Sequence, residues 1–507
     1  MKENYDFIVV GGGAAGCIMA KQLAIKNDGD ILLIEAGGYG TDDRFRIPSI
    51  ENLFKTWFTD CDWQLNTLPQ KGLNNREVVI NQGKVLGGGA AINALMYVRG
   101  NKLNFEEWYK ISGFNDNWNP KTILKNFKEL ESFDSDNASS DRGINGPICV
   151  SRPTKPSFAS TAFIQGCLEN GYKKGDFNAQ SQNDIVDYMQ LIVNKKGHRS
   201  STYREFLEES TPSNLTIKCL SEVKKLILKD ERCTGVILND NQKINAKKTI
   251  LCAGALSTPK ILFNSGIGDP YELENFGLKC KIKNSFIGKN LSDHLRVMIA
   301  YESSIDPGIT DYLCEAALFT RSGLQESGEV DLQINFSAGV QGFVPDEFIP
   351  EKGLSNSVIF VPVLARPTSK GTISIKNVKN EECLVNIDPN YLGNDLDLDI
   401  YKKGVNICRT IAKSSPMKDF CNSELCPGDH YEDSDYLKKH ATTIWHPVGS
   451  CSLGDSDNNS ACSADFKLRG IDGIYVADAS IIPTLPSGNP QASIFALSMI
   501  ASEIISG

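Results

Sequence analysis

Apolar residues in the N-terminal part of the chain predict a strand–helix–strand unit. Residues 7–10 and 31–34 are two continuous apolar runs, the pattern of strands that are covered on both faces. Between them, residues 17–24 are mostly small and apolar, as in a closely packed helix. A helix that connects two buried strands is typical of an α/β sheet.

Further along the chain the pattern changes, and the change predicts a second domain. We expect helices within 103–133 and at 156–171, 201–209 and 395–414, and a loop at the Asp/Asn/Ser-rich stretch 135–146. Short alternating runs at 215–252 predict a β-meander. From 295 to 380 several segments suggest antiparallel strands, so a β-rich second domain is predicted to begin near residue 295.

A glycine-rich turn joins the first predicted strand to the helix. Gly11, Gly13 and Gly16 have the spacing G-x-G-x-x-G, and Glu35 ends the next strand 19 residues after Gly16. The first glycine permits the turn, the second lets the backbone approach a pyrophosphate, and the third lets helix and strand pack closely. The helix N-terminus offers free N–H groups, and Glu35 can accept from ribose hydroxyls. The turn predicts a dinucleotide site but does not separate FAD from NAD.

Composition narrows the possible partners. The 507 residues carry a net charge of −9, which makes nucleic acid and anionic lipid poor candidates. The 15 cysteines are scattered without CxxC pairs, which argues against a disulfide framework and structural zinc, and no metal site is predicted. The N-terminus lacks a leader pattern, and the apolar stretch 494–505 is too short to span a bilayer. We therefore expect a cytoplasmic protein with no transmembrane segment.

Several further motifs follow in order. Residues 84–93 form a second glycine-rich loop, suited to a flat ring or a phosphate, and residues 251–262 lead from a strand into a helix through small residues. His446 lies in a Trp-His-Pro-Val-Gly turn, Asp478 ends a strand at 475–480, and Asn489 precedes Pro490 and the last helix.

Together with residues 197–201, 288–294 and 366–371, these motifs resemble the glucose–methanol–choline (GMC) family of flavin-dependent oxidoreductases over nearly the whole chain. The closest resemblance is to bacterial choline-dehydrogenase-like members and to aryl- or furfuryl-alcohol oxidases.

The resemblance implies an α/β FAD-binding Rossmann-like domain plus an α+β substrate domain with an antiparallel sheet. It assigns residues 1–145, 199–295 and 455–507 to the FAD-binding domain, and residues 146–198 and 296–454 to the substrate domain. Some members attach the flavin covalently through a His in the second glycine-rich loop. The matching residue here is Ile92, so we expect non-covalent FAD.

The resemblance also implies the reaction: oxidation of a primary alcohol to an aldehyde by hydride transfer to flavin N5. The matching catalytic positions are His446 and Asn489. Imidazole, with an ordinary pKa near 6.5, suits the base that removes the hydroxyl proton, whereas an amide can only hold the oxygen. The structural alternatives are a buried His that serves its turn and an Asn that caps the last helix.

Cofactor contacts are implied at the positions that match the family's motifs. Asp478 has the alternative role of capping its strand end. Trp445 is either a wall of the substrate pocket or a core residue. We interpret His294 as a structural residue that satisfies backbone groups. The implied cofactor-binding residues are Gly11, Gly13, Ala14, Ala15, Gly16, Glu35, Ala36, Val85, Gly87, Gly88, Asn93, Ala94, Leu95, Met96, Val223, Ala253, Asp478, Ala479, Pro490 and Gln491.

Some questions stay open at this point. The electrons pass to O₂ or to a quinone-type acceptor. A hydroxynitrile-lyase-type carbon–carbon cleavage, a light-driven fatty-acid decarboxylase and a flavin-binding scaffold are the alternatives on the same fold. The substrate pocket is expected between about residues 300 and 440, where no motif identifies the alcohol and where a cationic substrate such as choline would require a carboxylate. The oligomeric state is not predicted.

Overall fold

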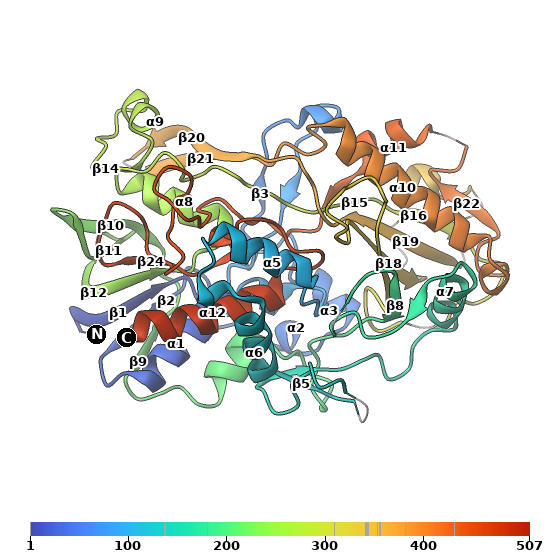
Figure 1. Ribbon diagram of the computed structural model, residues 1–507, viewed down its shortest axis with the longest axis horizontal. Coiled ribbons are helices and arrows are strands. Elements are labelled where there is room, and N and C mark those ends of the chain that lie inside the picture. The colour runs from blue at the N-terminus through green and yellow to red at the C-terminus, as the bar shows by residue number, and fades with distance from the viewer. Residues whose placement is uncertain are drawn as a thin grey trace.

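The predicted strand–helix–strand unit forms the centre of a seven-stranded sheet (Figure 1). A computed structural model describes residues 2–135, 138–179, 181–308, 310–339, 344–351, 353, 356–380, 382–429 and 431–507. In it, β1 (Asn4–Val10) pairs in parallel with β2 (Ile31–Ile34), and α1 (Ala14–Lys26) connects the two strands. The remaining strands are β9 (Leu215–Lys218), β10 (Val223–Lys229), β11 (Arg232–Leu238), β12 (Lys243–Leu251) and β24 (Ile474–Val476).

The predicted β-meander is confirmed over residues 223–251, where β10, β11 and β12 pair antiparallel in sequence order, whereas β9, at the start of the predicted segment, pairs in parallel with β2. Strand β12 then pairs in parallel with both β1 and β24, so the meander is continuous with the parallel part of the sheet. The last helix, α12 (Gln491–Ser506), packs beside α1, and both chain ends lie at this end of the molecule (Figure 1).

The second half of the chain forms most of a nine-stranded, mainly antiparallel sheet. Helices α7 (Phe158–Glu169) and α10 (Asp395–Ala412) pack against β18, and stacked Phe163 and Phe336 rings, 4.7 Å apart, lie in this core. Its strands are β7 (Lys173–Lys174), β8 (Ile185–Tyr188), β15 (Leu295–Arg296), β16 (Ile299–Glu302), β17 (Ala316–Thr320), β18 (Leu332–Ala338), β19 (Ser357–Leu364), β22 (Ser423–Cys426) and β23 (Thr442–Thr443).

The remaining elements connect the two sheets or cover them. The predicted helical stretch 103–133 contains α5 (Lys102–Ile111) and α6 (Pro120–Leu130), whereas the helix expected at 201–209 is a short π-helical turn, Arg204–Glu208. The hairpin of β20 (Thr372–Lys379) and β21 (Glu382–Asp388) packs against α8 (Gly254–Asn264). The shorter elements are α2 (Asp43–Arg46), α3 (Ile50–Phe54), α4 (Gly89–Ile92), α9 (Pro270–Asn275), α11 (Asp433–His440), β3 (Leu65–Asn66), β4 (Val79–Ile80), β5 (Glu131–Phe133), β6 (Ile148–Val150), β13 (Ile267–Gly268) and β14 (Ile282–Lys283). The domain boundaries given above stay a prediction.

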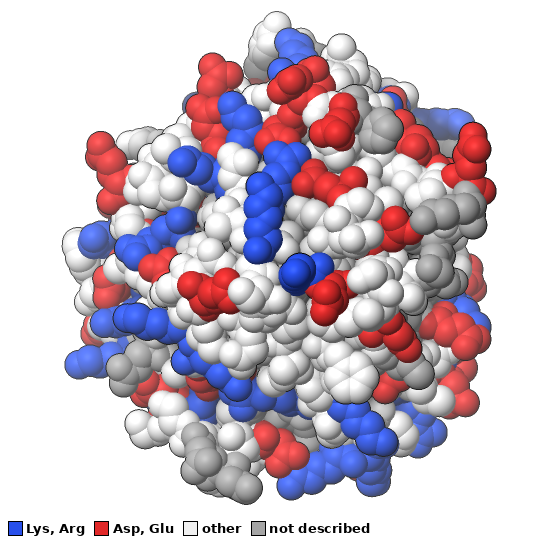
Figure 2. Space-filling view, turned by 90° about the vertical axis from the view of Figure 1, so that its right-hand side faces the viewer, with Lys and Arg blue, Asp and Glu red and all other residues white. Residues whose placement is uncertain are grey.

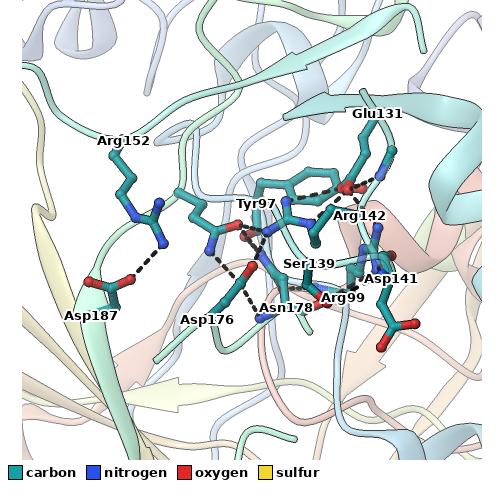
Figure 3. Close-up of polar contacts among 12 residues, drawn as sticks. Tyr97, Arg99, Glu131, Ser139, Asp141, Arg142, Arg152, Asp176, Asn178 and Asp187 are labelled. Atoms are coloured by element: carbon teal, nitrogen blue, oxygen red, sulfur yellow. Dashed lines mark hydrogen bonds and ion pairs between the residues drawn. The ribbon is translucent and has the colours of Figure 1, made fainter. Parts of the chain in front are cut away.

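A buried ionic network ties the end of α6 to the segment before α5 and to the loops that follow α6 (Figure 3). The Glu131 carboxylate, at the end of α6, accepts from Arg99 at 2.6 Å and from Arg142 at 2.7 Å. Arg142 also binds Asp176 at 2.7 Å and lies over the Phe133 ring. The side chains of Glu131 and Arg142 have no exposed surface.

The outer end of the nine-stranded sheet has a mixed charge pattern. Figure 2 shows Lys and Arg side chains interspersed with Asp and Glu over this face. None of the helices within the described residues has the length and apolarity to cross a membrane. The described residues also contain no cluster of three metal-ligating side chains, and all 15 cysteines are free.

Candidate active site

A cavity of about 410 Å³ lies between the two sheets. Its floor is formed by residues at the end of β1, by the second glycine-rich loop and by the start of α12, and its far wall by residues of β15, β18 and β19. The predicted site residues that line it are Gly11, Gly13, Ala14, Ala15, Glu35, Ala36, Gly88, Asn93, Ala94, Met96, Val223, Ala253, Trp445, His446, Asp478, Ala479, Asn489, Pro490 and Gln491. Residues from all parts of the chain therefore meet at one site.

The two glycine-rich loops touch each other at the floor of this cavity. The Gly87 N–H donates to the Gly12 carbonyl at 2.7 Å. At Gly11, with φ +97°, a Cβ would lie 2.5 Å from the Cys252 carbonyl oxygen, and at Gly16 it would lie 1.8 Å from the Gly11 oxygen. Side chains are thus excluded at the turn, and α1 begins against the cavity with its first N–H groups free for an anion.

Two buried carboxylates flank these loops and differ in what they leave free. Glu35 accepts from the N–H groups of Gly12 at 2.7 Å and Gly37 at 2.8 Å, and burial raises its pKa to about 7. Each of its oxygens keeps a second lone pair that a ribose hydroxyl can use. The Asp478 carboxylate instead accepts four bonds: from the Gly254 N–H, the Thr258 hydroxyl, and the N–H and hydroxyl of Ser480. Its capping role is therefore the one that the contacts show, although it lines the cavity.

Buried amides in the cavity wall have polar atoms without a protein partner. Gln491 Nε2 and both polar atoms of the Asn81 amide have no hydrogen bond among the described residues. Asn93, by contrast, is fixed, because its oxygen accepts from Arg199 at 2.6 Å and its amide donates to Gln491. An unpaired buried amide costs about 1–3 kcal/mol, so these groups point to a polar ligand. With the glycine floor and the free helix N-terminus, the site fits a dinucleotide that carries a polar ring, as FAD does.

His446 lies at the far side of the cavity and touches a second histidine. Its Nδ1 is 2.9 Å from Nδ1 of His294, and its Nε2 is 3.2 Å from Nδ2 of Asn489. Its N–H donates to Asp293 at 2.7 Å, which fixes the backbone of the turn. Burial lowers the pKa of His446 well below its ordinary value, so the ring is neutral at pH 7.

The protonation of the two imidazole rings follows from the contact that His294 makes through its second ring nitrogen, Nε2. His294 Nε2 is 2.9 Å from the Ala365 carbonyl oxygen, which can only accept, so this nitrogen carries a hydrogen. Burial lowers the pKa of His294 to about 3, so the ring is neutral and its Nδ1 is a bare acceptor. His446 must then donate from Nδ1, which leaves its Nε2 as a hydrogen-bond acceptor. The amide of Asn489 donates to that nitrogen, in agreement with this assignment.

The structural interpretation of His294 is therefore incomplete. The ring does satisfy a backbone carbonyl, as expected, but its other nitrogen holds the predicted base. The helix-cap alternative for Asn489 is wrong: α12 begins at Gln491 with Pro490 as N-cap, and the Asn489 side chain contacts His446 and, at 3.4 Å, Gln333.

With this geometry described, comparison with known proteins gives the family. Models of the N-terminal and C-terminal parts of GMC oxidoreductases match residues 5–296 and 367–498. The chain belongs to the GMC oxidoreductase family.

Three relatives of this GMC oxidoreductase cover nearly its whole length. It is 30% identical to the alcohol dehydrogenase [acceptor] of Pseudomonas putida, with 99% of this chain and 95% of the relative covered. It is 29% identical to the oxygen-dependent choline dehydrogenase 1 of Chromohalobacter salexigens, with 97% and 92% covered. The crystal structure of pyridoxine 4-oxidase from Mesorbium loti superposes with a TM-score of 0.87 at 26% identity, and the match covers 98% of both chains.

These comparisons confirm the family, the fold class and the predicted reaction class of this GMC oxidoreductase, FAD-dependent oxidation of an alcohol. They also confirm that it is an enzyme and that its cofactor is FAD.

Four of the implied cofactor residues lie behind the cavity wall of this GMC oxidoreductase. Gly16 is enclosed between α1 and β1, Val85 is packed near Phe45, and Gly87 and Leu95 have positive φ of 94° and 70°. Their side chains or backbones shape the loops, so their direct contact with the cofactor stays a prediction.

Trp445 of this GMC oxidoreductase faces the cavity and also packs against a neighbouring ring, and its contact with a substrate stays a prediction. It lines the cavity and packs edge-on against Trp57, with ring centroids 4.6 Å apart. Trp57, Trp63 and Asn81 complete that side of the wall but belong to no motif that is recognisable in the sequence.

Proposed function

We propose that this protein oxidises a primary alcohol to an aldehyde, with His446 as the base that receives the hydroxyl proton. The single observation that carries the proposal is the chain of contacts from the Ala365 carbonyl through His294 to His446, which ends at His446 Nε2 beside the Asn489 amide in the cavity wall. A base within hydrogen-bond reach of the proton is the geometric requirement of this chemistry.

Each residue has one task in the proposed reaction. The substrate hydroxyl takes the place of the Asn489 amide as donor to His446 Nε2, and Asn489 then holds the hydroxyl oxygen from the side. When bound, FAD supplies the two-electron acceptor for the hydride that leaves the carbinol carbon. Removal of the hydroxyl proton favours that loss, because charge builds on the oxygen.

The neighbouring histidine stabilises the proton after transfer. A protonated His446 keeps its Nδ1–H bond to His294, whose opposite N–H is held by the Ala365 carbonyl. Positive charge on His446 thus polarises the hydrogen-bonded series that runs through His294 to the Ala365 carbonyl oxygen. This offsets part of the burial cost that keeps the free ring neutral.

The proposal includes non-covalent attachment of FAD. Ile92, in the second glycine-rich loop, lines the cavity and carries no nucleophile. Acid precipitation of the yellow protein is expected to leave all the flavin in the supernatant; colour in the pellet would overturn this part.

The reaction itself is tested by adding alcohols to the holoenzyme without oxygen. We expect loss of the visible flavin absorbance with a primary alcohol, and no loss with the matching alkane or methyl ether. A flavin that stays oxidised with every alcohol of a broad panel would contradict the proposal. Admitting air or a quinone afterwards shows which acceptor restores the colour.

A further inference from the structure

One charged side chain lines the far wall of the cavity. The described residues that contribute to the wall from the nine-stranded sheet include Arg296, Met298, Asn335, Ser337, Ile359 and Val361, and of these only Arg296 carries a charge. The other charged lining residues, Glu35, Glu222, Lys260 and Asp478, lie on the side of the glycine-rich loops, where Lys260 is paired with Glu222 and Glu382.

The strand alternation directs Arg296 to the cavity. Asp293 and Leu295 line a separate small cavity with Tyr391, so they face the opposite side of the segment. Arg296 and Met298, at alternate positions, line the large cavity and keep some exposed surface there.

Arg296 also lies close to the catalytic pair. It pairs with Thr442 in the ladder of β15 and β23, and the Ile444 N–H donates to the His294 carbonyl in the same ladder. Two residues of an extended strand advance by about 6.5 Å, so the Arg296 backbone lies one such step from that of His294.

Arg296 differs from the other buried and half-buried arginines because its guanidinium forms no ion pair or hydrogen bond with the described residues. Arg142 binds Glu131, Arg366 binds Glu107 and Glu329, and Arg409 binds Glu424. Arg199, which has no carboxylate partner among the described residues, still donates to Asn93. The Tyr401 and Tyr436 hydroxyls are close enough to act electrostatically on the Arg296 guanidinium, but neither is an anion at neutral pH, and no carboxylate of the described residues is paired with it. A guanidinium stays charged at pH 7, and an enclosed charge without a counter-ion is costly.

We propose that Arg296 binds an anionic group of the substrate, so that the alcohol which this enzyme oxidises also carries a carboxylate or a similar anion. The fork of a guanidinium matches a carboxylate through two parallel hydrogen bonds. The anion binds Arg296 while the carbinol reaches His446 and Asn489, which favours a compact substrate with a few bonds between the two groups. This inference rests on the proposed function for the position of the carbinol.

The same arrangement argues against a cationic substrate. A quaternary ammonium alcohol in this cavity would meet Arg296 and no carboxylate from the described residues of the far wall. Like charges in an enclosed site repel, so choline is expected to be a poor substrate.

The experiment uses three alcohols with the same reacting carbon. Anaerobic flavin reduction in the holoenzyme is followed with 4-(hydroxymethyl)benzoate, 4-methylbenzyl alcohol and 4-(trimethylammonio)benzyl alcohol. We expect the apparent second-order rate constant to be about 10- to 100-fold higher for the anionic alcohol than for the neutral one, as for a charge-assisted hydrogen bond, and lowest for the cation.

Variants at Arg296 then assign the preference to this side chain. R296M should lower the rate constant for the anionic alcohol by about 10- to 100-fold more than the rate constant for the neutral alcohol. R296K should keep part of the preference, and R296E should reverse it toward the cation. The control R321M, at an exposed arginine paired with Asp184, should alter each rate by less than about twofold. Retained FAD absorbance shows that each variant is folded.

Equal rates for the three alcohols in the wild type, or an equal loss for all three in R296M, would overturn the inference. A binding arm separates it from the proposed function. 4-Methylbenzoate has no hydroxyl and should perturb the visible flavin spectrum in the wild type but not in R296M. That result without reduction by any alcohol would support the anion site while the proposed function fails. Absence of binding, together with reduction by neutral alcohols, would refute only the anion site.

Discussion

Two buried polar clusters in this protein differ in what they leave unsatisfied. Around Glu131 (Figure 3), two arginines and two carboxylates neutralise one another, and most of their polar atoms are paired within the protein. At His446 both rings are neutral, and the chain from Ala365 through His294 ends on a lone pair in the wall of a cavity. The first cluster is closed and fixes loops. The second ends at His446 Nε2, where a substrate hydroxyl can displace the Asn489 amide and lose its proton.

The largest effect on flavin reduction is expected at His446, where the second cluster meets the cavity. H446A removes the proton acceptor and should lower the rate of anaerobic flavin reduction by about 10²- to 10⁴-fold, the usual contribution of a general base. Bound FAD should be retained, because the polar partners of His446 within the described part of the chain are His294, Asn489 and Asp293. Stopped-flow reduction checks this, and a loss below tenfold would assign the base elsewhere.

The next effect concerns the Glu131 cluster and appears as a change in the free energy of unfolding. E131A leaves Arg99 and Arg142 buried without their carboxylate and should lower the free energy of unfolding by about 3–5 kcal/mol. Urea denaturation at fixed excess FAD measures it. The reduction rate per bound flavin should stay near that of the wild type; a large fall there would show that the two clusters are coupled.

A smaller effect on flavin reduction is expected at His294, the residue whose ring contacts the base. H294A frees the protonation of His446 and should slow flavin reduction by about 10- to 100-fold, less than H446A, because the base itself remains. H294N, which keeps a donor and an acceptor, should restore part of the rate.

The pH profile distinguishes this positioning role from a general loss of structure. Wild-type reduction should stay constant well below pH 6.5, because burial holds the pKa of His446 low. H294A admits water beside the ring, so the acid limb should move to higher pH. An unchanged limb with a reduced plateau would point to disordered packing instead.

The smallest effect is on the pH dependence of stability. Burial lowers the pKa of His294 to about 3, whereas the unfolded chain titrates near 6.5. The unfolded state therefore gains a proton first, and stability is lost as the pH falls from about 6.5 toward 3, by roughly 1.4 kcal/mol per pH unit for one such group. H294N should make urea midpoints fall less steeply between pH 7 and 5; an identical slope would show that His294 does not titrate in this way.

Sequence patterning predicted much of the fold because its signals are local. The spacing of Gly11, Gly13 and Gly16 is required within one turn, and the apolar runs around it identify buried strands without knowledge of their partners. His446 and Asn489 are predicted as catalytic from the family resemblance. Each residue on its own would indicate a structural role.

The features of the site that could not be predicted depend on contacts between residues far apart in the sequence. The partner of His446 lies 152 residues away, and no periodicity near His294 indicates that its ring faces another imidazole. The Asn-Pro pair at 489 and 490 gives a strong capping signal, yet the nearby lone pair of His446 attracts that amide instead. For Arg296, the informative fact is that no carboxylate among the described residues pairs with it, which only the packed structure reveals.

The central claim is that His446 presents an unprotonated Nε2 to the cavity at neutral pH. Nitrogen-15 NMR of the protein labelled at its histidines, with the His446 signals assigned by their loss in H446Q, reports this directly. The account predicts a protonated Nδ1 and a bare Nε2 on His446, and a protonated Nε2 on His294. A protonated Nε2 on His446 in the resting enzyme would contradict it.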